Sequence, residues 1–154
     1  VIDRFPDAIG GDLLRIPDRM SNWTNLLVVV HRRPNKLYAR NIKGATAQTT
    51  LTAFKHILKE VLEQFDEPEI FECDAGAEFK SVFADFLKRR GIQRRVLKLV
   101  PYVEKKNGTL MKNISYLKDL GVGWKAALPK AISKIKNVVS RVTKQKENDV
   151  GKYA

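Results

Sequence analysis

Three acidic residues fall where catalytic groups of an α/β protein are commonly found, at strand ends and at a helix start. Asp12 lies on the first predicted strand, Asp74 ends the fourth, and Glu104 opens the third predicted helix. Hard divalent cations prefer oxygen ligands, and a pair of such ions can activate both the attacking and the leaving oxygen of a phosphodiester. The three acids therefore predict a metal-dependent phosphoryl-transfer site. Spacing alone singles them out weakly, because the chain holds 17 acids.

Each of these acids also has a purely structural interpretation. Asp12 can end a turn, Asp74 can cap a strand end, and the helix dipole favours Glu104 in a first helical turn. Glu78, four residues after Asp74, is interpreted as a helix-start residue rather than a fourth ligand. The sequence contains no Gly-x-Ser-x-Gly motif, Walker loop or GxGxxG motif, so it gives no support to serine catalysis or to those modes of nucleotide binding.

The apolar pattern predicts the elements that position the acids. Turn residues and apolar runs predict strands at 12–16, 26–31, 37–42, 69–74 and 92–97, and three- and four-residue apolar spacing predicts helices at 46–65, 78–90, 102–119 and 124–142. Three successive strands predict an antiparallel meander, and the alternating strands and helices that follow predict βα units. We therefore expect an α/β fold with a mixed five-stranded sheet and helices on both faces.

Length and composition limit the classes of protein to consider. A chain of 154 residues with 44% hydrophobic residues suits a single globular domain spanning 1–154. The longest apolar run, Leu26 to Val30, is far shorter than the roughly 20 residues that cross a bilayer, which argues against a membrane protein. The single cysteine, Cys73, cannot form an internal disulfide, and a structural zinc site of four cysteines is excluded.

Positive charge is concentrated in the second half of the chain. Residues 1–87 carry a net charge of −2, whereas residues 88–154 carry +14. A concentrated positive field attracts a polyanion, and nucleic acid is the commonest one. The predicted nucleic-acid-binding residues are Arg89, Arg90, Arg94, Arg95, Lys105, Lys106 and Lys112. The alternative interpretation is a solvated cationic face.

Several segments resemble integrase catalytic cores of retroviruses, LTR retrotransposons and Maverick-type elements. Residues 26–40 (LLVVVHRRPNKLYAR) are similar to the strand-turn-strand of these cores. Residues 73–79 (CDAGAEF) resemble the segment that carries their second metal-binding Asp, and residues 103–110 (VEKKNGTL) resemble the helix start that carries their Glu. Residues 11–14 (GDLL) stand in the place of their first acidic strand. The resemblance covers nearly the whole chain.

The resemblance implies an RNase H-like fold and an activity. In that family two Mg²⁺ or Mn²⁺ ions support transfer of a DNA 3′ hydroxyl onto a phosphodiester, and here Asp12, Asp74 and Glu104 match the three ligands. It further implies DNA as the partner, basic residues that contact DNA on the helix after Glu104, and a homo-oligomer or larger assembly. An active integrase would work in the nucleus; without activity, the expectation is an intracellular protein of undetermined compartment.

The sequence also departs from the family pattern, which keeps other functions open. Ala75 replaces the Asn that follows the second Asp, His31 stands where an Asp that is not a ligand is usual, and the loop 98–102 is short. One alternative is an integrase-derived domain without catalysis, a basic component of a larger assembly that binds DNA or RNA. Another is an RNase H-like nuclease acting on RNA/DNA hybrids, which matches the segments around Asp74 and Glu104 less well.

Overall fold

The computed structural model of the chain describes residues 6–15, 25–121 and 126–134. Their elements follow one another as β1 (Ala8–Arg15), β2 (Asn25–His31), β3 (Lys36–Ile42), α1 (Ala47–Gln64), β4 (Ile70–Cys73), the 3₁₀ helix η1 (Ala77–Phe79), α2 (Val82–Arg89), β5 (Gln93–Val96) and α3 (Pro101–Asp119). Residues 126–134 are also helical. Within these ranges no helix is both long and apolar enough to cross a bilayer.

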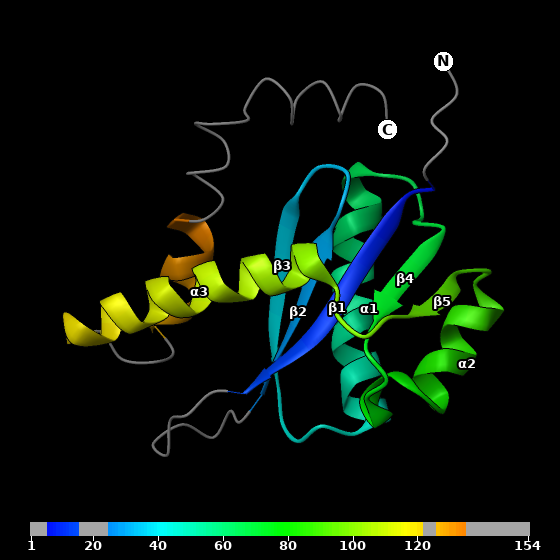
Figure 1. Ribbon diagram of the computed structural model, residues 1–154, viewed down its shortest axis with the longest axis horizontal. Coiled ribbons are helices and arrows are strands. Elements are labelled where there is room, and N and C mark those ends of the chain that lie inside the picture. The colour runs from blue at the N-terminus through cyan, green and yellow to red at the C-terminus, as the bar shows by residue number, and fades with distance from the viewer. Residues whose placement is uncertain (1–5, 16–24, 122–125, 135–154) are drawn as a thin grey trace.

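The five strands form one mixed sheet in the order β3-β2-β1-β4-β5 (Figure 1). β1, β2 and β3 pair antiparallel, as a meander, while β4 and β5 add parallel to β1 through helical crossovers. The predicted α/β fold with a mixed five-stranded sheet is therefore confirmed. Parallel strands need such crossovers because the chain must return to the same end of the sheet before the next strand begins, whereas a tight turn gives an antiparallel neighbour.

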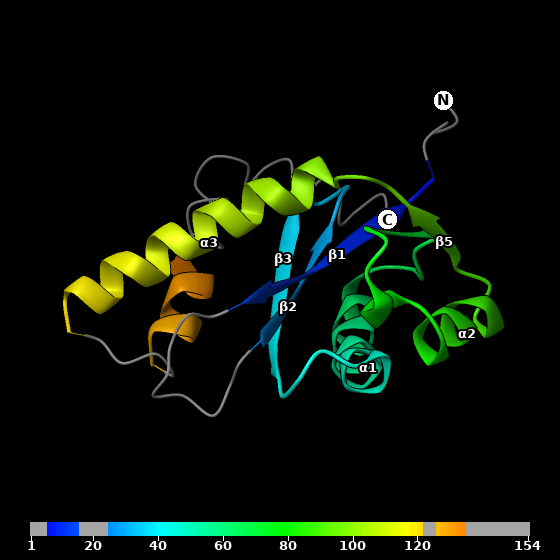
Figure 2. The same cartoon turned by 60° about the horizontal axis from the view of Figure 1, so that its bottom comes forward.

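Helices cover both faces of the sheet, as predicted. α1 and α2 lie on one side, and α3 crosses the other side with the helical segment 126–134 next to it (Figure 2). β2 is buried along its whole length because its alternate residues face opposite layers. Leu27 and Val29 pack toward α1, whereas Leu26, Val28 and Val30 pack toward α3. This double burial explains the continuous apolar run that makes β2 visible in the sequence.

The first strand begins earlier than predicted. The prediction placed the Gly10-Gly11 pair before a strand at 12–16, but β1 starts at Ala8 and contains both glycines. A Cβ on Gly10 would lie 2.7 Å from Val103 Cγ2, and one on Gly11 would lie 2.6 Å from the ring of Phe71. The glycines are therefore sites of close packing on opposite faces of the strand, not turn residues.

The helix predictions are correct in place and differ at their ends. Thr46 caps α1 as predicted, because its side chain accepts a hydrogen bond from the Thr49 backbone at 3.1 Å. The predicted helix at 78–90 is interrupted: Ser81 has a φ of 53°, which separates η1 from α2. α3 begins at Pro101, a residue suited to a first helical position. The ends of the helix predicted at 124–142 lie outside the described residues.

Candidate active site

Parallel pairing of β1 with β4 brings two of the predicted acids to the same level of the sheet. The register pairs Gly10 of β1 with Glu72 of β4. Asp12 stands two residues after Gly10, and Asp74 stands two residues after Glu72, directly beyond the end of β4. Residues two apart on a strand share a face, which here is the face covered by α3. Glu104 lies in the first turn of α3. The fold thus brings the three predicted acids to one region.

The Asp12 carboxyl group is influenced by both of the other acids. Its side chain is half-buried, and this burial is the main reason that its pKa rises from 3.8 to about 6. The negative charges of Glu104 and Asp74 raise the pKa further. Asn107 Nδ2 donates a hydrogen bond to Asp12 Oδ2 at 3.0 Å, and this contact acts in the opposite direction. An ionised carboxylate in these surroundings costs free energy, which a nearby cation would reduce.

Asp74 and Glu104 are held in different ways. Asp74 Oδ1 accepts a hydrogen bond from the backbone N–H of Gly76 at 2.8 Å, so this side chain also caps the turn after β4. Glu104 is exposed, and its backbone N–H donates to the carbonyl of Val100 at 3.0 Å at the start of the helix. The strand-end and helix-start interpretations of these residues are therefore both observed, and they fix the backbone that carries each carboxylate.

The donor set suits a hard cation, although the side chains do not close around one position. Carboxylate oxygens are the ligands that Mg²⁺ and Mn²⁺ take in phosphoryl-transfer sites. Within the described ranges, no group of three or more His, Cys, Asp or Glu side chains stands close enough together to hold one ion. The half-buried position of the Asp12 carboxyl group, on the sheet face toward which Asp74 also lies, is the feature that favours a cation here.

Two polar residues of this region were not predicted as site residues. Asn107 is 5% exposed and orients Asp12 from α3, one helical turn after Glu104. Glu72 is 4% exposed and lies on the same face of β4 as Asp74. The sequence did contain a signal for both residues, which is a polar side chain at a position that faces inward. Asn107 shares the apolar face of its helix, and Glu72 comes two residues before Asp74 and so faces the same side of the sheet.

The basic cluster around β5, predicted as one phosphate-binding group, divides between the two sides of the sheet. Arg89 and Arg90 end α2, where Arg90 pairs with Glu67. Arg94 is half-buried on β5. Arg95 is paired in register with Glu72 and therefore faces the acids. Of this cluster, only Arg95 shares the acid side, and the side chain of Arg95 is 54% exposed.

The lysines predicted on α3 also differ from one another. Lys105 and Lys112 are exposed and can reach a phosphate backbone. Lys106 is only 8% exposed, so most of its side chain is packed within the protein. Phosphate contacts from Lys105, Lys106 and Lys112 therefore stay predictions, and the exposed Lys105 and Lys112 are the better placed of the three.

Sheet order, helix placement and the location of the acids together define an RNase H-like fold of the integrase-core type, as predicted. Solved structures agree with this assignment. The HTLV-2 integrase catalytic core domain in complex with magnesium matches in its trimeric form with a TM-score of 0.66 and 22% identity over 81% of each chain. The dimeric form of that complex matches with a TM-score of 0.65 and the same identity and coverage.

A larger assembly gives a similar result. The simian T-cell lymphotropic virus intasome in complex with PP2A regulatory subunit B56 gamma matches with a TM-score of 0.69 and 19% identity. The match covers 81% of this chain and 46% of that chain, so this chain corresponds to less than half of it. No protein-family model and no curated protein matches the sequence. At these identities, the likeness establishes the fold.

Proposed function

We propose that this domain is the catalytic core of a polynucleotidyl transferase of the integrase type, which cleaves and joins DNA strands with two Mg²⁺ or Mn²⁺ ions. Asp12, Asp74 and Glu104 are the proposed ligands. The observation that carries this proposal is the arrangement of three carboxylates in the fold: Asp12 on β1, Asp74 directly after the neighbouring parallel strand β4, and Glu104 in the first turn of α3. The magnesium complex of a structurally similar integrase core supports the choice of metal.

Each residue has a distinct part in the proposed site. Asn107 orients Asp12 by donating a hydrogen bond to one of its oxygens. The Gly76 N–H holds one oxygen of Asp74 at the end of β4. Glu104 is exposed, so it has the freedom to turn toward the other two acids. Bound divalent cations would act as Lewis acids and neutralise charge on the phosphate.

Nucleic acid is the proposed partner, with DNA favoured over RNA. Arg95, Lys105 and Lys112 are exposed on or next to the elements that carry the acids, and they would neutralise backbone phosphates. The similar structures include dimeric and trimeric integrase cores and an intasome, which supports a homo-oligomer or a larger assembly. A DNA integrase of this kind would act in the nucleus.

The test is strand resolution of a branched DNA that mimics a joined intermediate, in the presence of Mn²⁺. We expect the native chain to resolve it and Asp74→Asn to lose the activity. Asp66→Asn is the matched control, because Asp66 is an exposed carboxylate outside the site, and it should keep full activity. Equal activity of the native chain and Asp74→Asn would contradict the assignment of the ligand.

A second function is favoured by one observation. Within the described parts of the chain, the acids do not form a closed metal-binding group. An integrase-derived domain that has lost catalysis, and that binds nucleic acid as a structural component, would retain the fold and the positive charge. Salt-sensitive DNA or RNA binding by a folded native protein, without strand resolution in Mn²⁺, would favour this second function.

A further inference from the structure

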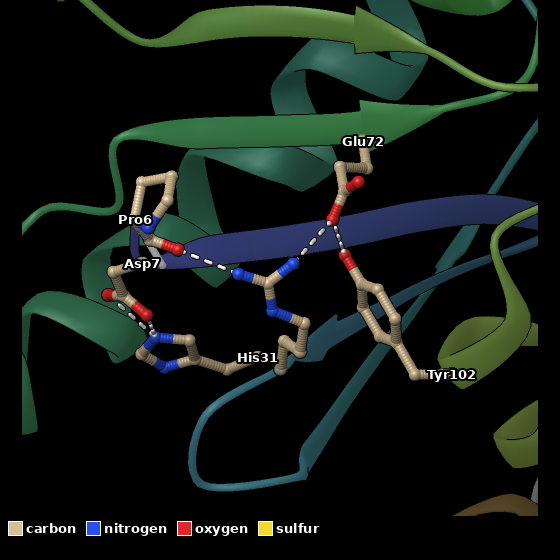
Figure 3. Close-up of polar contacts among 6 residues, drawn as sticks. Pro6, Asp7, His31, Glu72 and Tyr102 are labelled. Atoms are coloured by element: carbon tan, nitrogen blue, oxygen red, sulfur yellow. Dashed lines mark hydrogen bonds and ion pairs between the residues drawn. The ribbon is translucent and has the colours of Figure 1, made fainter. Parts of the chain in front are cut away.

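Glu72 is a buried carboxylate at the centre of a polar cluster between β4 and α3. Its side chain is 5% exposed, and a buried charge is tolerated only with close partners. Tyr102 Oη donates a hydrogen bond to Glu72 Oε1 at 2.8 Å, and Arg32 Nη1 donates to the same oxygen at 3.4 Å (Figure 3). Arg95 Nη1 lies 3.9 Å from Oε2. The cluster thus combines one carboxylate, two guanidinium groups and a phenol.

The cluster is anchored to the start of the chain as well. Arg32 Nη2 donates to the backbone carbonyl of Pro6 at 2.7 Å. Next to it, His31 Nε2 lies 2.9 Å from both carboxylate oxygens of Asp7 (Figure 3). Arg32 is therefore held on both sides, by Pro6 and by Glu72. A guanidinium fixed in this way holds the Glu72 side chain in place for the phenol.

The phenol of Tyr102 fits against β1 because residue 10 is a glycine. Gly10 stands beside Glu72 in the parallel register, and a Cβ at Gly10 would lie 2.8 Å from Tyr102 Oη. The Tyr102 ring therefore lies directly against β1. Burial, together with the bond to Glu72, raises the pKa of Tyr102 above its ordinary value of 10, so the hydroxyl stays a donor throughout the neutral range.

Both members of this hydrogen bond stand two residues before a proposed ligand. Glu72 precedes Asp74 on β4, and Tyr102 precedes Glu104 in the first turn of α3. Resting on the proposed function, we infer that Glu72 and Tyr102 are positioning residues, whose hydrogen bond sets the distance between the start of α3 and the end of β4. The bond joins the two elements just before the proposed ligands, so it limits how far Glu104 can move from Asp74.

Tyr102→Phe tests this role, because phenylalanine keeps the ring and removes only the hydroxyl. The matched control is Tyr116→Phe on the same helix, where the side chain is 54% exposed. Two properties are measured on the full chain: hydrogen exchange of the backbone amides at residues 103–107 without metal, and the Kd for Mn²⁺ by calorimetry. A charge-assisted hydrogen bond of this kind corresponds to about a tenfold effect on each.

We expect Tyr102→Phe to exchange about tenfold faster at residues 103–107 and to bind Mn²⁺ about tenfold more weakly, with no change in Tyr116→Phe. Unchanged exchange in Tyr102→Phe would overturn the link between α3 and β4. Faster exchange with an unchanged Kd would overturn its positioning role. If the native chain itself binds no Mn²⁺, the proposed function fails, and faster exchange would then show a packing contact without a positioning role.

Discussion

The two sides of β1 and β4 differ in almost every physical respect. Toward α1 and α2, these strands present Ile9, Phe71 and Cys73 to an apolar core. Toward α3, the same strands present Gly10, Asp12 and Glu72, and Asp74 follows directly after β4. One side is packed without charge, whereas the other holds a buried ionic cluster and a half-buried carboxylate of raised pKa.

This contrast places the apolar core and the proposed site on opposite faces of the same two strands. On the apolar side, Phe71 packs against Phe54, Phe79 and Phe83, with ring centroids 5.1 to 5.6 Å apart. On the acidic side, groups of like charge face one another, which disfavours the folded state when no cation is present. A rigid apolar layer allows the opposite layer to hold unfavourable charges in place.

The first prediction tests the apolar side by removing the Phe71 ring. Phe71→Ala should lower the free energy of unfolding by about 3 to 5 kcal/mol, because the side chain is fully buried within an aromatic cluster. Urea denaturation measures the effect. Val96→Ala, at a side chain that is 45% exposed, serves as the control and should change stability by less than about 0.5 kcal/mol. Similar losses in both variants would contradict the contrast between the two sides.

The second prediction tests the acidic side and has the opposite sign. In the metal-free protein at pH 7.5, Asp12→Asn should raise the free energy of unfolding by about 1 to 2 kcal/mol, after allowance for solvent screening. The folded-state pKa of Asp12 is raised from 3.8 to about 6. The folded state therefore binds the proton more tightly, and stability is lost as the pH rises through this range.

The pH dependence supplies the control for this prediction. Below about pH 3 the carboxyl group is protonated in both states, so the advantage of Asp12→Asn should disappear there. It should grow between about pH 3 and pH 7, most steeply between the two pKa values of 3.8 and about 6, and stay constant above that range. Urea denaturation of both proteins in the presence of EDTA measures the difference at each pH. A variant that is less stable than the native protein at pH 7.5 would show that Asp12 is a stabilising residue.

Much of the fold could be predicted because local patterns determine it. The apolar run of β2 reflects burial on both faces, and the spacing in α1 reflects its packed stripe. The strand limits of β1 could not be read in this way, since Gly10 and Gly11 are ordinary turn residues by type. Their place in the strand depends on Val103 and Phe71, which lie 60 or more residues away in the chain.

The convergence of the three acids could be predicted from the sequence, whereas their surroundings could not. Residues at strand ends and helix starts indicated Asp12, Asp74 and Glu104, because such positions converge in α/β folds. The contacts of Glu72 join segments 30 and 40 positions apart, to Tyr102 and to Arg32, so no local pattern indicates them. The division of the basic cluster likewise depends on the register of β5 with β4, which only the assembled sheet determines.

The third prediction uses that division and has the smallest effect. Arg95 faces the acids, with its side chain 54% exposed and its Nη1 3.9 Å from Glu72 Oε2. Arg90 instead lies at the end of α2, paired with Glu67 and placed over the Phe86 ring at 5.6 Å. If DNA lies along the acid side, Arg95→Ala should lower the slope of log affinity against log salt by about 0.9, the share of one phosphate contact. Arg90→Ala should leave that slope unchanged and cost less than about 1 kcal/mol of stability, as expected for an exposed ion pair.

Fluorescence anisotropy with labelled duplex DNA over a salt series measures both slopes. An equal loss in the two variants would mean that nucleic acid also covers the end of α2, and that the basic cluster acts as one surface despite its division in the sheet.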